Sequence, residues 1–81
     1  MGSSTKDKPQ QVEFYRKLGV NLREARKRAN LSQDEVANLV GLKRTSLTNI
    51  EGGRQHPPLH VLCEIVERLN VCVSDVLPTE Q

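Results

Sequence analysis

The chain has 81 residues and a net charge of +2, which suits one small domain with a modest core. Two cysteines, Cys63 and Cys72, are too few for a disulfide scaffold and match no zinc-binding spacing, so we expect reduced thiols, no metal site and no cofactor. Because no apolar run approaches the roughly 20 residues of a membrane span and no signal peptide opens the chain, the sequence predicts a cytoplasmic protein.

Charge is distributed unevenly along the chain. Residues 16–54 hold nine Lys or Arg against four acids, whereas the residues after 54 hold one Arg against four acids. This division favours a protein that turns one face toward a polyanion. A solvated helix surface with many salt bridges is the alternative that charge alone leaves open.

Residues 1–10 are polar and show no apolar periodicity, and we expect them to be disordered. A first helix is predicted over residues 11–29, although Gly19 lies inside it and weakens the pattern slightly. Asn30 is suited to end this helix, because Asn tolerates the left-handed backbone conformation. The apolar stripe of the helix has steps of three and four residues and consists of Phe14, Leu18, Leu22, Ala25 and Ala29.

A second helix is predicted over about residues 32–40. It opens with a capping box, in which Ser32 can accept a hydrogen bond from the Glu35 amide while the Glu35 side chain reaches back to the Ser32 amide. Gly41 is expected to end it. Its apolar face is expected to hold Val36, Leu39 and Val40.

A third helix is predicted over about residues 43–51, followed by glycines at 52 and 53. Its only apolar residues are Leu47 and Ile50, and the positions from 43 to 49 otherwise carry hydrogen-bonding side chains without an acid. A solvated helix face normally mixes acids with bases, whereas a face that enters the major groove of DNA avoids carboxylates because phosphates flank it.

A fourth helix is predicted after Pro57 and Pro58, whose fixed backbone angle suits a helix start. Ser74 is expected to cap a last short helix over residues 75–77, which Pro78 ends. The inner face of the fourth helix is expected to hold Leu59, Leu62, Cys63, Val66 and Leu69.

More apolar side chains occur in this C-terminal part than a small core needs. We therefore expect part of the fourth helix, with Val71, Val73 and Val76, to form a dimer interface. A further domain of a longer protein that covers this surface is the alternative.

The stretch LSQDEVANLVGLKRTSLTNIEGGR, residues 31–54, resembles the phage repressor and Cro family, also called the Xre-type helix-turn-helix family. The matching motifs are LSQ at the start of the second helix, Ala37 followed by Gly41, and IEGGR at the end of the third; the resemblance covers residues 14–77. It implies an all-α, compact five-helix bundle of the phage-repressor type over residues 11–78, with a tail at 79–81. It also implies a homodimer on a palindromic operator.

The resemblance further implies roles for single residues. Lys43 stands where the family usually has Ser or Thr as a helix cap. The first residue of the third helix is therefore open, and so is which side chain, that of Lys43, Arg44 or Thr45, reaches deepest into the DNA groove. His56, in the loop after the third helix, is a further candidate for a phosphate contact. The resemblance assigns base contacts to Arg44, Thr45 and Asn49, and contacts to the DNA backbone to Gln33, Lys43, Ser46, Thr48 and Arg54.

Physical arguments support most of these roles. The first turn of a recognition helix faces the groove, and Asn49 projects from the same face as Thr45 one turn later. Arg26 and Glu51 match a structural ion pair of the family. Because their positions border the predicted core, where an unpaired charge is costly, pairing is also expected on physical grounds.

The sequence therefore predicts a sequence-specific transcriptional regulator whose partners are double-stranded DNA, a second copy of the chain and, if it activates transcription, RNA polymerase. We expect no membrane partner and no enzymatic activity, because no nucleophile stands beside a base and no phosphate-cradling glycine-rich loop occurs. A restriction–modification controller, a phage-type repressor and an antitoxin are the possible subtypes. A protein-interaction module on the same fold is the alternative, and its third helix would be more apolar.

Overall fold

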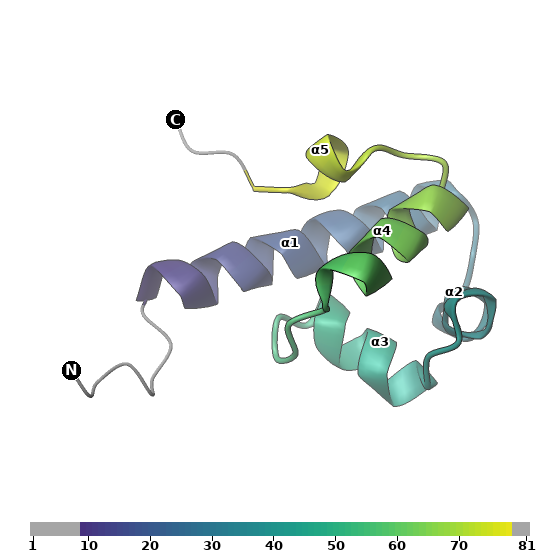
Figure 1. Ribbon diagram of the computed structural model, residues 1–81, viewed down its shortest axis with the longest axis horizontal. Coiled ribbons are helices and arrows are strands. Elements are labelled where there is room, and N and C mark those ends of the chain that lie inside the picture. Colours follow the sequence, from purple (N-terminus) through teal and green to yellow (C-terminus); the bar gives the residue numbers. More distant parts are fainter. Residues whose placement is uncertain (1–8, 79–81) are drawn as a thin grey trace.

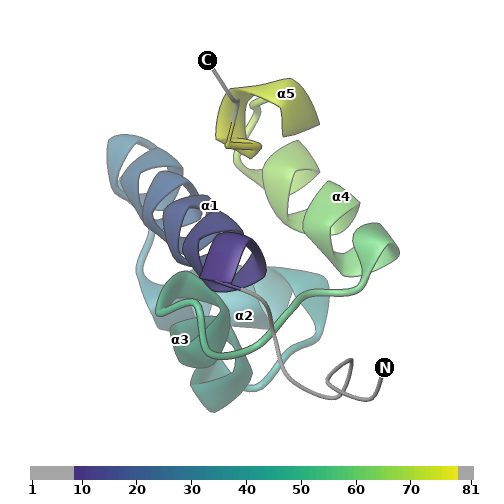
Figure 2. The same cartoon turned by 90° about the vertical axis from the view of Figure 1, so that its left-hand side faces the viewer.

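The computed structural model describes residues 9–78, which form five helices and no strand. α1 and α4 lie in the middle of the molecule, with α5 on one side of them and the α2–α3 pair on the other (Figures 1 and 2). This arrangement confirms the predicted all-α five-helix bundle. The helices are α1 (Pro9–Arg28), α2 (Gln33–Val40), α3 (Arg44–Glu51), α4 (Leu59–Arg68) and α5 (Val73–Val76).

The end of α1 and both ends of α2 follow local sequence signals. Ser32 Oγ accepts a hydrogen bond from the Glu35 amide at 3.0 Å, and Glu35 Oε1 accepts one from the Ser32 amide at 2.7 Å, so the predicted capping box is present. Asn30 and Gly41 adopt positive φ angles of 60° and 73° where α1 and α2 end. α1 begins at Pro9, two residues earlier than expected. The rest of the segment predicted to be disordered, residues 1–8, and the predicted tail, residues 79–81, lie outside the described residues.

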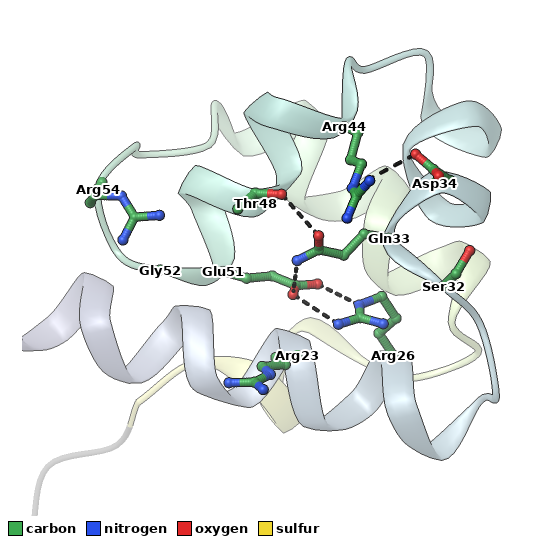
Figure 3. A pocket seen from close by; sticks show the side chains of 10 residues that line it. All are labelled: Arg23, Arg26, Ser32, Gln33, Asp34, Arg44, Thr48, Glu51, Gly52 and Arg54. Carbon is green, nitrogen blue, oxygen red and sulfur yellow. Dashed lines mark hydrogen bonds and ion pairs between the residues drawn. The ribbon is translucent and has the colours of Figure 1, made fainter.

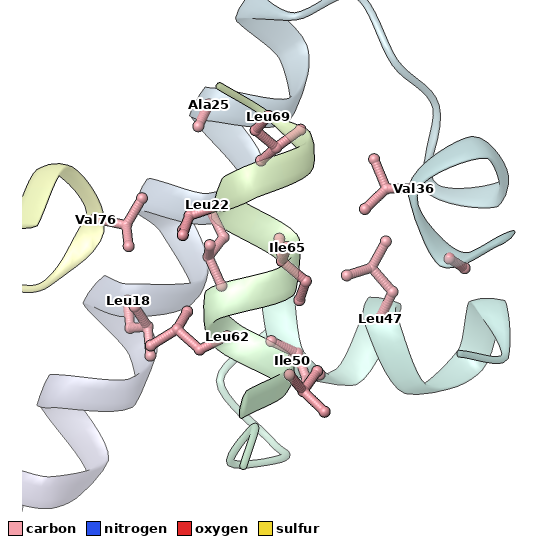
Figure 4. Close-up of a cluster of buried hydrophobic side chains, with 13 residues drawn as sticks. Leu18, Leu22, Ala25, Val36, Leu47, Ile50, Leu62, Ile65, Leu69 and Val76 are labelled. Atoms are coloured by element: carbon pink, nitrogen blue, oxygen red, sulfur yellow. The ribbon is translucent and has the colours of Figure 1, made fainter. Parts of the chain in front are cut away.

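A single apolar core lies between α1, α4 and the α2–α3 pair (Figure 4). Leu22 of α1, Leu47 of α3 and Ile65 of α4 are each only 1% exposed, so all three of these helices contribute fully buried side chains. None of the helices described in residues 9–78 is long and apolar enough to cross a membrane. Within the described residues, the buried apolar side chains of this core are those of Leu18, Leu22, Ala25, Val36, Ala37, Leu47, Ile50, Val61, Leu62, Ile65, Val66, Leu69 and Val76.

The predicted inner face of α4 is wrong at two positions. Leu59 is 71% exposed and Cys63 is exposed, whereas Val61 and Ile65 are buried in their place. Both sets of residues have helical spacing, and the packing of α4 against α2 and α5 selects the second set. Similarly, Leu39 of α2 is 46% exposed and Ala29 lies on the surface, so neither belongs to the core as expected.

The short last helix also begins differently from the prediction. α5 starts at Val73, and its N-cap is Cys72 rather than Ser74. The Asp75 side chain accepts a hydrogen bond from the Cys72 amide at 2.8 Å, which fixes this first turn. Asn21 Nδ2 of α1 donates to the carbonyl of Val76 at 2.8 Å and thereby ties α5 to the longest helix.

Three valines near α5 were expected at a dimer interface, and they differ in exposure. Val76 is 1% exposed and belongs to the core, so its side chain lies beneath the surface on which a partner could dock. Val71 and Val73 are half-buried and pack against the core from outside. The apolar surface available for self-association therefore excludes the Val76 side chain.

Candidate nucleic-acid interface

α3 presents one outward face of polar side chains. Its buried residues are Leu47, Ile50 and Glu51, and these hold the opposite face against the core. Arg44 and Thr45 are exposed, while Ser46, Thr48 and Asn49 are half-buried. An open hollow of the surface is lined by Arg44, Thr45, Thr48 and Asn49, so the fold brings together the three predicted base-contacting residues.

A buried ion pair fastens the end of α3 to α1 (Figure 3). Arg26 Nε donates to Glu51 Oε2 at 2.7 Å and Arg26 Nη2 donates to Glu51 Oε1 at 3.1 Å. The two side chains are 10% and 4% exposed. Arg26 Nη1 also donates to the carbonyl of Leu31 at 2.9 Å, which joins the loop before α2 to the same guanidinium. Bidentate pairing of this kind fixes orientation as well as charge.

Gln33, the first residue of α2, extends this network to the outward face of α3. Its Nε2 donates to Glu51 Oε1 at 2.9 Å, and its Oε1 accepts a hydrogen bond from Thr48 Oγ1 at 2.9 Å. Arg26, Glu51, Gln33 and Thr48 thus form one continuous chain of hydrogen bonds across three helices. The sequence resemblance assigns Gln33 a contact to the DNA backbone; in the free protein its side chain braces α3 through Thr48, one turn after Arg44.

The loop after α3 folds back onto the last turn of that helix. Arg54 Nε donates to Asn49 Oδ1 at 3.2 Å, and the Asn49 carbonyl accepts hydrogen bonds from the amides of Arg54 and Gln55 at 2.8 and 3.2 Å. A residue predicted to contact phosphate and one predicted to contact a base are therefore bonded to each other in the free protein.

This loop also rests on α1. The rings of Tyr15 and His56 stack with centroids 3.7 Å apart and an interplanar angle of 10°. Gly53, at φ 78°, lies so close to the backbone of Arg16 that a Cβ would be 2.9 Å from the Arg16 Cα. Arg16 in turn hydrogen-bonds Glu13 and lowers the pKa of that exposed carboxyl group. The backbone of the loop that carries Arg54 is thus held from two sides, by α3 and by α1.

An open hollow of about 540 Å³ lies between α1, α2 and α3, above the buried ion pair. Arg23, Arg44 and Arg54 line it, each from a different element, and Figure 3 shows them around the same cavity. Arg23 was not predicted as a site residue. The signal that could have found it is its spacing of three residues before Arg26, which places both on one side of α1.

The polar face of α3 itself carries no acid, as predicted, but an acid from α2 lies beside it in the folded protein. Asp34, on the first turn of α2, places its Oδ1 3.9 Å from Arg44 Nε. Both side chains are exposed, at 66% and 64%.

Lys43, the N-cap of α3, makes no side-chain capping bond and is exposed. Across residues 9–78, no cluster of three or more His, Cys, Asp or Glu could hold a metal ion.

Comparisons with known proteins agree with this geometry. A family model described as a helix-turn-helix domain matches residues 17–77. The ImmF control region 10 kDa protein of Bacillus phage phi105 is 35% identical over 65 residues, which cover 80% of this chain and 72% of the phage protein. An uncharacterized HTH-type transcriptional regulator of Archaeoglobus fulgidus is 29% identical over 59 residues, which cover 73% of this chain and 83% of that protein.

Among solved structures, the restriction–modification controller protein C.AhdI from Aeromonas hydrophila is similar, with a TM-score of 0.74 and 28% identity. The similarity covers 78% of this chain and 96% of the controller protein. The fold, the polar face of α3 and these relatives define a helix-turn-helix DNA-binding protein of the transcriptional-regulator class. The chain belongs to the Xre-type helix-turn-helix family, as its sequence predicted.

Proposed function

We propose that the protein is a sequence-specific regulator of transcription that binds a two-fold symmetric operator as a homodimer, with α3 of each copy in the major groove. The observation that carries the proposal is the outward face of α3, where Arg44, Thr45 and Asn49 stand together around one hollow. The opposite face of the helix is fixed to the core by Leu47 and Ile50. A rigidly held polar helix of this kind can enter a groove without losing its own packing.

Each proposed base-contacting side chain has a natural partner in the groove. The Arg44 guanidinium can donate two hydrogen bonds to guanine O6 and N7, and the Asn49 amide can pair with adenine N6 and N7. The methyl group of Thr45 can pack on a thymine methyl. Arg54 holds Asn49 Oδ1 in the free protein; in the complex we expect the Arg54 side chain to turn outward to a phosphate, which leaves this oxygen wholly to adenine N6.

The proposed contacts to the DNA backbone surround this face. Lys43, Ser46 and Arg54 supply two cations and a hydroxyl at its border. Gln33 and Thr48 primarily brace α3. The Gln33 amide nitrogen keeps a second hydrogen that can be donated to a phosphate while the network is intact. The Thr48 hydroxyl donates its one hydrogen to Gln33 in the free protein, so it must rotate away from Gln33 to donate to a phosphate.

For the dimer, we propose the surface formed by α4 and α5. Val71 and Val73 lie at its base, and Leu59 and Leu77 are 71% and 36% exposed. A two-fold dimer would place the two copies of α3 about 34 Å apart, one turn of DNA. Similarity over nearly the whole length of the controller protein C.AhdI supports a compact controller as the subtype, and the phage relative supports a phage-type switch. Either would act in the cytoplasm.

Selection from a random duplex library followed by a salt titration tests the proposal. We expect an enriched site with two-fold symmetry, whose affinity falls steeply as salt rises because Lys and Arg displace counterions from the phosphates. The double variant Thr45→Ala/Asn49→Ala should lose the enriched bases, whereas Arg28→Ala at the end of α1 should keep them. Absence of any enrichment would refute sequence-specific binding and would favour an interaction module on the same fold.

A further inference from the structure

The ion pair between Asp34 and Arg44 has no role in the function described so far. Arg44 is the first residue of α3, where the helix dipole is positive and disfavours a cation, and the first turn of α3 contains no acid. Asp34 is the nearby carboxylate that offsets this, although it belongs to α2. The pair joins the two helices of the helix-turn-helix at the edge of the proposed groove-facing surface.

The geometry of the pair leaves Arg44 able to move. A separation of 3.9 Å lies within ion-pair distance but beyond the reach of a good hydrogen bond. Exposed pairs of this kind contribute little to folding. The pair itself therefore adds little to the stability of the fold. The first turn of α2 favours an acid through the helix dipole, but Glu35 already supplies one there. The position of Asp34 beside Arg44 calls for a further explanation, because a carboxylate close to DNA phosphates is repelled by them.

The identity of the paired nitrogen suggests that explanation. The ion pair is made through Nε of Arg44, which leaves the two terminal nitrogens as a fork for the O6 and N7 atoms of guanine. Gln33 is less suited than Asp34 to this task, because its amide oxygen already accepts a hydrogen bond from Thr48 and carries no negative charge to attract the guanidinium. Asp34 is thus the side chain that can hold the guanidinium from the side while its fork meets a base.

We propose that Asp34 is a positioning residue that fixes the Arg44 guanidinium and so sharpens the preference of this protein for guanine at one position of each half-site. The inference rests on the proposed function of α3. Asp34 contributes specificity through Arg44 and at the same time lowers the affinity for every DNA sequence through its own charge. Removal of this carboxylate should therefore change base specificity and overall affinity in opposite directions: the preference for guanine should weaken, and binding to unrelated DNA should become tighter.

A double-mutant cycle on the selected operator tests the inference. Operators with guanine and with each other base at the Arg44 position are titrated against the parent, Asp34→Asn, Arg44→Ala and the double variant. We expect Asp34→Asn to lower the preference for guanine about two- to fivefold, the range reached by exposed ion pairs, and to tighten binding to an unrelated duplex. Asp34→Glu should restore most of the preference, and Asp34→Asn should have no effect on it in the Arg44→Ala background.

Glu24→Gln on α1 is the matched control, since it removes one exposed carboxylate that lies on neither α2, α3 nor the proposed dimer surface. The inference is overturned if Asp34→Asn and Glu24→Gln leave the base preference equally unchanged, or if Asp34→Asn alters the preference without Arg44, because Asp34 would then contact a base itself. Failure of the parent protein to select any site refutes the proposed function instead, and this inference with it.

Discussion

Gly19 of α1 lies directly on the last turn of α3, so that a Cβ on Gly19 would be 2.7 Å from the carbonyl oxygen of Ile50. No side chain fits between the two helices at this point. The close approach lets α1 cross α3 near its end, and two turns further along α1 the guanidinium of Arg26 reaches Glu51. The glycine that weakens the helical pattern in the sequence is therefore a requirement of the packing.

Replacement of Gly19 by alanine should destabilise the protein. Alanine favours a helix over glycine by about 1 kcal/mol, but overpacking of a tight contact typically costs about 1–3 kcal/mol. We expect the second effect to exceed the first in urea unfolding, with Val20→Ala, at the neighbouring exposed position, as the control. A gain in stability for Gly19→Ala would show that the two helices can separate without cost.

The Arg26–Glu51 pair should be essential for the fold and only indirectly for DNA binding. Arg26→Ala leaves a buried carboxylate without its cation, and loss of one partner of such a pair costs about 3–5 kcal/mol. We expect a large drop in melting temperature by circular dichroism. Joint replacement of both residues by methionine should cost much less, because no buried charge remains. An Arg26→Ala variant that melts like the parent would contradict this account.

Much of the fold could be predicted because its signals are local. The Ser32–Glu35 capping box and the positive φ angles at Asn30 and Gly41 depend on residues close in sequence. The pairing of Arg26 with Glu51 could be predicted because both positions border an apolar stripe, where an unpaired charge is costly.

The buried face of α4 was predicted wrongly at two positions because two apolar stripes with helical spacing overlap in its sequence. In α4, Leu59 and Cys63 fit one apolar stripe while Val61 and Ile65 fit another, and only the packing of neighbouring helices decides between them. The same limit applies to the site. The approach of Asp34 to Arg44, the turn of Gln33 toward Thr48 and the bond between Arg54 and Asn49 depend on the angle between α2 and α3 and on the path of the following loop. No spacing in the sequence encodes them.

The hydrogen bonds of Gln33 should stabilise the α2–α3 unit. Gln33→Ala removes the partner of both Thr48 and Glu51, and we expect a loss of about 1–2 kcal/mol in urea unfolding. Gln33→Glu should cost more, because it places a second carboxylate beside Glu51. Asn38→Ala, at an exposed position of the same helix, is the control. Equal stability of Gln33→Ala and Asn38→Ala would show that the network has no energetic role.

A charge on the proposed dimer surface should separate the two copies. Leu77 follows α5 and is 36% exposed, whereas Leu39 lies on α2 with 46% exposure. We expect the parent and Leu39→Asp to sediment as dimers, and Leu77→Asp to sediment as a monomer that keeps its helical circular-dichroism spectrum but melts at a lower temperature, because the stabilisation by the partner is lost. Dissociation by Leu39→Asp alone would place the interface elsewhere, and a monomeric parent would refute the proposed homodimer.

In the proposed complex α3 reads bases while the surrounding residues hold the DNA backbone. The decisive measurement repeats the library selection and salt titration with Arg44→Ala and Arg54→Ala. We expect Arg44→Ala to relax the preference at one base of each half-site. Arg54→Ala should weaken binding to all sequences alike and reduce the salt slope by about one charge per site. Identical behaviour of the two variants, in base preference and in salt slope, would contradict the division of roles.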